Sequence, residues 1–238
     1  GDGVLYMVLD RFFSAFMKEP KFTPAERDYY GIFHEYLMAA WQGREAARDT
    51  AACPTSGSST SQSNQLFIDG LEIPVEDRIG EEHRGFEYIL HGLNPERILI
   101  AGTTCGIGEV ALKRACNYAS EREVFGRLIG ANQSISHPLA QAYMQLQAAW
   151  QMVQLAGWRY DNDMDCGEAA NTAKFLAAEA AFFAADRAIQ THGGLGYASE
   201  YHVERYWREA RLQRLAPVSQ EMTLNYMAQQ VLGLPRSY

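Results

Sequence analysis

The stretch Gly92-Leu93-Asn94-Pro95-Glu96-Arg97-Ile98 opens the part of the chain whose spacing is most informative. We expect helical structure from about Gly85 onward, and Asn94 and Pro95 suit the cap and first turn of a helix, which would put Glu96 at a helix N-terminus. The apolar positions that follow recur every three or four residues, as on one face of a helix. They are Ile98, Ala101, Cys105, Gly108, Leu112 and Ala115.

Two further stripes with helical spacing follow, separated by polar breaks near residues 120–135 and 161–168. The first is Tyr143, Leu146, Trp150, Val153, Gly157 and Tyr160, and the second is Ala173, Leu176, Ala180 and Phe183. A second face of the last helix carries Ala177, Ala181, Ala184 and Ala188, which predicts close packing or a subunit contact. Shorter helices are expected at about 200–213 and 219–231. The sequence therefore predicts a mainly α fold, an up-down four-helix bundle over residues 84–238.

The front of the chain has a different organisation. Residues 1–53 are predicted to form a helical appendage, and residues 54–63 are so rich in serine and other small polar residues that we interpret them as a linker. Residues 64–83 contain an alternating segment around Asp69-Gly70, which favours a short hairpin or paired strand.

Composition excludes several classes of protein. The formal net charge of -8 disfavours nucleic acid and anionic membranes as general partners, and no apolar run is long enough for a membrane span. The cysteines (Cys53, Cys105, Cys116 and Cys166) include no Cys-x-x-Cys pair, which favours free thiols in a reducing compartment such as the cytoplasm or the mitochondrial matrix. No histidine spacing typical of a metal site is present, so no metal is expected. The first residue is Gly1, so we expect the true start to be missing or processed.

Three segments could carry chemistry. Glu96 could act as a general base, or it could simply complement a helix dipole in a first turn. Arg122-Glu123-Val124-Phe125-Gly126 offers a guanidinium for phosphate, or merely a helix-terminal arginine with a core phenylalanine. The segment from Gln190 to Tyr197, Gln-Thr-His-Gly-Gly-Leu-Gly-Tyr, could let its backbone approach a ligand, or could be an ordinary helix C-cap and turn.

Taken together and in this order, these segments resemble the C-terminal helical domain of acyl-CoA dehydrogenases. The resemblance covers about residues 64–238, with residues 64–83 similar to the last strands of the family's middle β-domain, whereas residues 1–63 are unmatched. Leu93-Asn94-Pro95-Glu96-Arg97 is similar to the Leu-x-x-Glu-Arg segment that carries the base in isovaleryl-CoA and long-chain members. In most other members the base lies near the C-terminus, at a position where this chain has Pro217.

The resemblance implies roles for particular residues. Glu96 would be the catalytic base, and Arg97 would contact the substrate. Arg122 would meet the pyrophosphate of FAD, Phe125 would pack near its adenosine half, and Gln133 would lie at a cofactor-contacting position. Gln190, Gly193 and Gly194 would face the pyrophosphate of a neighbouring subunit's flavin. Ser219 and Glu221 match the close of the family's C-terminal cofactor motif.

The function implied by this resemblance is flavin-dependent α,β-desaturation of an acyl-CoA, with branched, long or bulky acyl groups favoured by the position of the base. It also implies an electron-transfer flavoprotein or similar acceptor and a homodimer or homotetramer. The rest of the middle β-domain, which supports the flavin ring, has no counterpart in the sequence. The alternative is therefore a truncated or non-catalytic relative that contributes helical-bundle contacts as a partner subunit.

Overall fold

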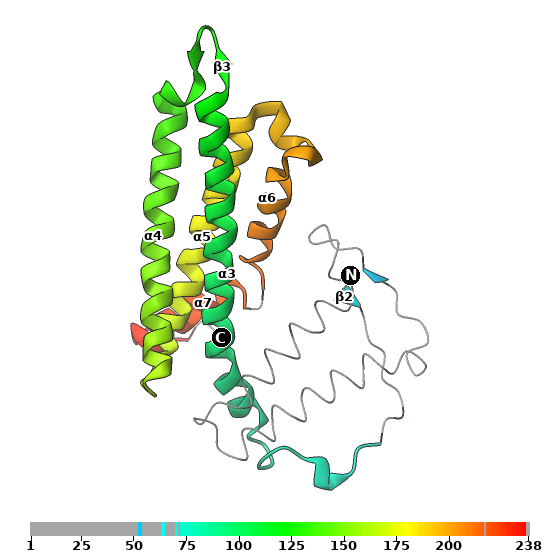
Figure 1. The fold of residues 1–238 in the computed structure, drawn as a ribbon. Helices are drawn as coiled ribbons and strands as arrows, with labels where there is room; N and C mark the ends of the chain where they lie inside the picture. The colour runs from blue at the N-terminus through cyan, green and yellow to red at the C-terminus, as the bar shows by residue number, and fades with distance from the viewer. Residues whose placement is uncertain (1–51, 54–62, 65–69, 71, 217, 237–238) are drawn as a thin grey trace. The chain divides into compact units, whose positions relative to one another are not determined.

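A computed structural model of the chain describes residues 52–53, 63–64, 70, 72–216 and 218–236. The chain divides into two compact units, residues 1–85 and 86–238. The helices of the described part are α3 (Gly85–Glu121), α4 (Gln133–Asp161), α5 (Gly167–His192), α6 (Val203–Leu212) and α7 (Gln220–Tyr226), and a π-helical turn, Met227–Val231, follows α7. Short 3-10 segments are Val75–Asp77, Ile129–Ala131, Gly193–Tyr197 and Ser199–Tyr201. The predicted mainly α bundle is confirmed (Figure 1).

The first bundle helix begins where helical structure was expected, but the predicted cap at Asn94 and Pro95 is wrong. α3 begins at Gly85, and Pro95 lies inside it, so Glu96 is not in a first turn. Proline removes only one backbone hydrogen bond of a helix, and the residues before it are compatible with helix, so the helix continues through this point. Because the dipole effect fades within the first turn, it cannot act on Glu96.

The core of the bundle is built largely from small side chains. α3, α4 and α5 lie side by side, with α6 along one edge of α5 (Figure 1). Gly108 of α3 packs so closely that a Cβ there would lie 2.6 Å from Leu146 Cδ2 of α4 and 2.9 Å from Ala181 Cα of α5. Ala177, Ala181, Ala184 and Ala188 of α5 are fully buried, which confirms the expected close packing. Small residues on α5 thus let three long helices meet at short range.

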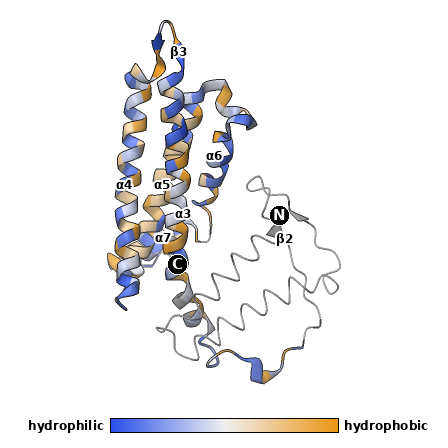
Figure 2. Cartoon of the chain, viewed as in Figure 1, coloured by the Kyte–Doolittle hydropathy of each residue, from blue (hydrophilic) through white to orange (hydrophobic). Residues whose placement is uncertain are grey.

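The predicted face of α4 is only partly correct. Leu146 and Val153 are buried, but Tyr143 and Trp150 are exposed. The face that packs inward carries Leu139, Ala142, Leu146, Ala149, Val153 and Ala156. α4 has apolar residues on more than one face, and Figure 2 shows hydrophobic residues along each of α3, α4 and α5. Periodicity cannot decide between two apolar faces, so the larger side chains were wrongly assigned to the core.

The strands of the described part are short. β1 (Ala52–Cys53) pairs antiparallel with β2 (Ser63–Asn64), so Ser63, predicted as linker, belongs to a strand. Residues 1–51, 54–62, 65–69 and 71 lie outside the described part, and the N-terminal appendage, the remaining linker and most of the predicted hairpin stay predictions. Ile73-Pro74-Val75 is not a strand, because Pro74 precedes the 3-10 turn that begins at Val75. A proline lacks the N–H that a strand ladder requires.

Candidate cofactor and acyl-CoA site

A tight hairpin follows α3 and presents Phe125 to solvent. β3 (Glu123–Val124) pairs with β4 (Arg127–Leu128), and Phe125 and Gly126 form the two-residue loop with φ of 52° and 73°. Such loops favour asparagine and glycine, because both positions need a positive φ. A bulky phenylalanine there is strained, and its side chain is 100% exposed. Local folding therefore does not explain Phe125, and strain at an exposed aromatic residue points to a ligand.

The polar residues around this hairpin complete the first half of the site. The Arg122 side chain is exposed, as is Gln133 in the first turn of α4. Arg127 is already engaged, since its Nη2 donates to the Ala131 carbonyl at 3.1 Å and to Asn132 Oδ1 at 2.7 Å. Among the described residues, no hydrogen bond or ion pair engages the Arg122 guanidinium, which leaves it available to a ligand three positions before Phe125.

The glycines after α5 have different structural roles. Gly193 ends the helix with a φ of 61°, which a residue with a side chain rarely adopts. Gly196 is buried, and a Cβ there would lie 2.6 Å from the Ile189 carbonyl oxygen. A Cβ at Gly194, by contrast, would meet nothing within 4 Å. The packing of this chain does not require glycine at position 194, so the open space above it is suited to a ligand.

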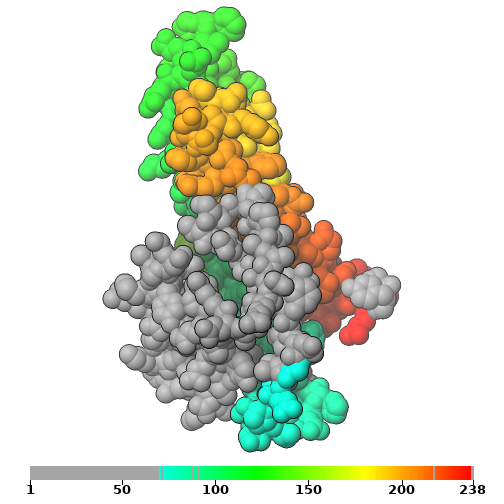
Figure 3. Space-filling view, turned by 90° about the vertical axis from the view of Figure 1, so that its right-hand side faces the viewer, coloured from blue at the N-terminus to red at the C-terminus, as the bar shows by residue number. Residues whose placement is uncertain are grey.

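An aromatic contact brings the two halves of this site to one end of the bundle. Tyr118, in the last turn of α3, stacks on His192 at 4.4 Å between ring centroids, and Tyr201 packs edge-on against both rings. The hairpin and the segment after α5 lie at the same end in Figures 1 and 3. Residues about 70 positions apart in sequence are therefore held together by stacking.

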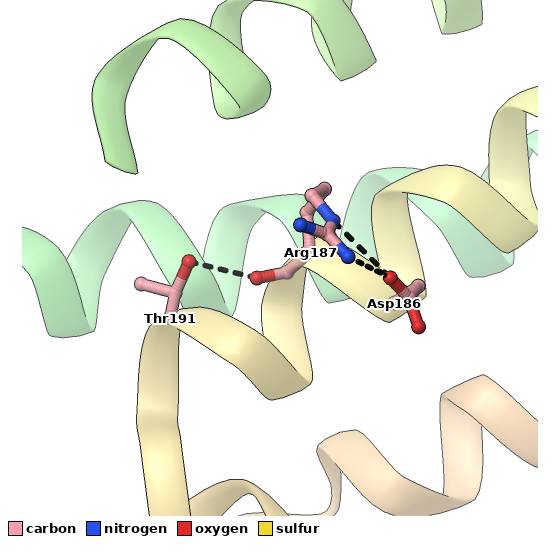
Figure 4. Close-up of polar contacts among 3 residues, drawn as sticks. All are labelled: Asp186, Arg187 and Thr191. Carbon is pink, nitrogen blue, oxygen red and sulfur yellow. Dashed lines mark hydrogen bonds and ion pairs between the residues drawn. The ribbon is translucent and has the colours of Figure 1, made fainter. Parts of the chain in front are cut away.

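Sequence reasoning missed Arg187, which lies one turn before Gln190. Its Nε donates to Asp186 Oδ2 at 3.1 Å, and its carbonyl oxygen accepts a hydrogen bond from Thr191 Oγ1 at 2.7 Å (Figure 4). Arg187 and Asp186 are partly exposed. Arg187 adds a second guanidinium near this end of the bundle and neutralises a carboxylate that would repel phosphate. The sequence feature that could have indicated Arg187 is the Asp186-Arg187 pair within an alanine-rich helix.

The candidate base lies far from these residues. The Glu96 side chain is exposed on α3, whereas its neighbour Arg97 is only 9% exposed. Arg97 Nη1 donates to Asn94 Oδ1 at 3.0 Å, and Arg97 Nε is buried without a partner. Burial lowers the pKa of Arg97, and nearby Tyr226 and Glu96 oppose that change. At 1.5 Å per residue, Glu96 and Arg122 are roughly 39 Å apart along α3.

Ser219 and Glu221 have a local structural role. Ser219 caps α7, and its hydroxyl accepts a hydrogen bond from the Met222 N–H at 3.3 Å. Hydrogen bonds from its own backbone N–H and from the Ser219 side chain lower the pKa of Glu221, with Arg211 and Arg214 adding to the effect. This arrangement is a helix cap, and a cofactor role for either residue stays a prediction.

Other groups in the described part add no further chemistry. Cys105, Cys116 and Cys166 are free, and burial raises the pKa of Cys105 to about 11. Among the described residues, no group of three or more His, Cys, Asp or Glu side chains is placed to hold a metal ion. No helix in the same part of the chain is long and apolar enough to cross a membrane.

Comparison with known proteins gives matches in both sequence and structure. The sequence model of the family described as "Acyl-CoA dehydrogenase, C-terminal domain" matches residues 83–232. Acyl-CoA dehydrogenase FadE12 of Mycobacterium tuberculosis is 46% identical over 176 residues, covering 73% of this chain and 45% of that protein. Butyryl-CoA dehydrogenase from Megasphaera elsdenii has a TM-score of 0.74 at 32% identity, over 77% of this chain and 48% of that one.

A second similar structure is glutaryl-coenzyme A dehydrogenase in complex with glutaryl-CoA, with a TM-score of 0.74 and 28% identity over 79% of this chain and 48% of that one. The fold and the exposed hairpin and glycine segments define a helical bundle of the type found in flavin-dependent acyl-CoA oxidoreductases. The chain belongs to the acyl-CoA dehydrogenase family. It spans about half the length of the relatives it matches.

Proposed function

We propose that this chain is the C-terminal part of an FAD-dependent acyl-CoA dehydrogenase, in which Glu96 removes the α-proton of an acyl-CoA thioester. When bound, the flavin would supply the acceptor for the β-hydride. The observation that carries the proposal is the strained, fully exposed Phe125 at the same bundle end as the open Gly194, within a chain that belongs to this family. Purified protein that is yellow and is bleached by an acyl-CoA would support it.

The residues at the hairpin end fit the adenosine and pyrophosphate parts of FAD. Arg122 offers forked donors for phosphate, Phe125 offers an aromatic face, and Gly194 leaves room for close approach of the backbone. Gln190, at the exposed end of α5, supplies an amide beside the glycines. This combination of charge, ring and open backbone is the one that a dinucleotide requires.

The distance between the Glu96 end and the hairpin end of the bundle determines which copies of the chain contribute to one flavin site. Glu96 and Arg122 lie roughly 39 Å apart on one helix, farther than one flavin dinucleotide reaches. The base end of one chain and the hairpin end of the same chain must therefore serve different flavins. A neighbouring copy would supply the hairpin and glycine contacts to the flavin that faces Glu96.

The surroundings of Glu96 determine under which conditions its carboxylate can accept a proton. The carboxylate is exposed in this chain, so proton transfer requires a dry wall contributed by flavin, substrate or additional protein. Arg97 is buried behind it and holds Asn94. Glu96 would act on the α-carbon proton, and Arg97 would support the helix from inside.

The same geometry favours a homo-oligomer. Several large apolar side chains on the outer face of α4 are exposed: Tyr143, Met144, Trp150, Leu155 and Trp158. A helix that is apolar on two faces is usually covered on both. We propose a dimer or tetramer, an electron-transfer flavoprotein or similar acceptor as redox partner, and a reducing compartment, the cytoplasm or mitochondrial matrix. A light-scattering mass equal to one chain at all concentrations would exclude the oligomer.

Substitutions at two neighbouring glycines separate ligand binding from folding. Gly194→Ala should leave the free energy of unfolding within about 0.5 kcal/mol, because the new Cβ meets no atom of the chain, yet weaken flavin retention about tenfold. Gly196→Ala should instead destabilise the bundle by about 1–3 kcal/mol, because its Cβ meets the Ile189 carbonyl. Urea unfolding and flavin titration measure the two effects. Equal flavin affinity for Gly194→Ala and the unmodified protein would remove Gly194 from the site.

Phe125→Gly tests whether strain at the hairpin serves the cofactor. Glycine accepts the positive φ without steric cost, so the apoprotein should gain about 1 kcal/mol of stability. Flavin affinity should fall about tenfold because the aromatic contact is lost. Val124→Ala, a smaller change one residue earlier at an ordinary strand position, is the control and should change neither quantity by as much. Unchanged flavin affinity in Phe125→Gly would contradict the assignment.

A further inference from the structure

The burial of Lys174 in α5 is not explained by a contribution to the stability of the fold. Its side chain is 1% exposed, whereas Lys113, the other lysine of the described part, is exposed. Removing an ammonium group from water costs free energy unless charges or hydrogen bonds compensate. Lys174 Nζ donates to the Val218 backbone carbonyl, and no ion pair within the described residues includes it. An apolar side chain of similar length would fill this position at lower cost.

The acceptor lies in the segment that leads from α6 into α7. We define residues 213–219 as the connector; position 217 is outside the described part. Val218 immediately precedes Ser219, the cap of α7. The connector turns back on itself, since the Gln220 N–H donates to the Arg214 carbonyl at 3.3 Å. Lys174 therefore holds the last part of the connector against α5.

A second contact from α5 holds the other end of the same segment. Arg214 Nη2 lies 2.7 Å from Glu179 Oε1, and Arg214 Nε donates to Gln220 Oε1 at 2.9 Å. Gln220 Nε2 in turn donates to Glu179 Oε1 at 2.6 Å. Lys174 and Glu179 are five residues apart on α5, so one helix holds the connector at two points.

Lys174 and α7 are also electrostatically linked to the residue beside the candidate base. Arg97 is close enough to Lys174 to repel it electrostatically, and Arg97 and Tyr226 of α7 also interact. Glu96 is the residue before Arg97 on α3. Lys174 thus joins α5 to the connector by a hydrogen bond, and it lies within electrostatic range of the part of α3 that carries Glu96.

We propose that Lys174 and Glu179 are positioning residues, which fix the connector and the start of α7 beside the Glu96 segment so that this end of the bundle forms one wall of the acyl site. The claim about the wall depends on the proposed function, whereas the claim about the connector does not. Neither residue is expected to contact the reacting atoms.

Amide hydrogen exchange of the full chain tests the anchors without any ligand. Lys174→Met should leave the free energy of unfolding equal or higher, because the buried charge is gone. It should nevertheless speed exchange of the amides at residues 213–222 at least about tenfold, with exchange in α4 unchanged. Lys113→Met, a matched change on the surface of α3, should alter neither the free energy of unfolding nor amide exchange at residues 213–222. Glu179→Gln should give the same local acceleration through the second anchor.

Unchanged exchange in the connector of Lys174→Met would overturn the proposal, as would an equal acceleration throughout the bundle, which indicates general destabilisation. If Lys174→Met does not fold, Glu179→Gln decides in the same way. In flavin-loaded protein, Lys174→Met should raise KM for an acyl-CoA more than it lowers kcat, because the base is intact and the wall is not. Lack of turnover in the unmodified protein would contradict the proposed function and leave the exchange result standing.

Discussion

Glu96→Gln is expected to stop the bleaching of bound flavin by an acyl-CoA while the protein stays yellow. Glutamine keeps the size and polarity of the side chain but cannot accept the α-proton. Loss of a general base typically costs about 10²–10⁴-fold in rate. Because glutamine keeps the size of the side chain and the proposed phosphate contacts come from the hairpin end, flavin affinity should hold. Stopped-flow absorbance measures the bleaching rate, and flavin content per chain measures retention.

The matched control for this experiment is Glu109→Gln. Glu109 is also an exposed glutamate of α3, and it lies about three and a half turns farther along the helix. The Glu109 variant should bleach at the unmodified rate. If the flavin bleached as fast in Glu96→Gln as in Glu109→Gln, another group would be the base. If the flavin bleached in neither variant and not in the unmodified protein, the alternative of a non-catalytic bundle would apply.

Gly108→Ala is expected to destabilise the contact between α3, α4 and α5. The added Cβ would lie 2.9 Å from the Ala181 Cα, a backbone atom that cannot move without shifting α5. Overpacking of this kind costs about 1–3 kcal/mol, and alanine recovers about 1 kcal/mol through its better helix propensity. The net loss should therefore be up to about 2 kcal/mol, which lowers Tm by up to roughly 4–8 °C.

Gly106→Ala provides the comparison on the same helix. A Cβ at position 106 meets nothing within 4 Å, so alanine should gain up to about 1 kcal/mol through helix propensity alone. Urea unfolding of both variants measures the difference. If the two variants were equally stable, α3 and α5 would not approach as closely as the structure shows.

Much of the fold follows from residue spacing. The stripe from Ala101 to Ala115 and the small-residue face of α5 were both predicted, and both are buried. Their periodicity reflects local geometry, because residues three or four apart lie on one side of any helix. The face of α4 was only partly predicted, since alanine positions such as Ala142 and Ala149 are less conspicuous than Tyr143 and Trp150.

The candidate site was predicted residue by residue through family motifs, but not its geometry. Helical structure was expected from about Gly85, but a cap was also expected at Asn94 and Pro95, whereas α3 runs through Pro95 and Glu96 does not lie at a helix terminus. The sequence also cannot distinguish Gly194, with open space around it, from Gly196, which packs on Ile189. That distinction depends on whether backbone atoms of an earlier helical turn, here those of Ile189, lie where the added Cβ would be.

The order of motifs and the helical periodicities establish a family and an α-helical bundle, because both are properties of neighbouring positions along one chain. Two facts depend on tertiary structure alone: the stacking of Tyr118 on His192 and the burial of Lys174 against Val218. Each is a contact between residues of different elements that the packing of the helices brings together. No local pattern contains such contacts, because the same motif would have the same sequence whichever helix packed beside it.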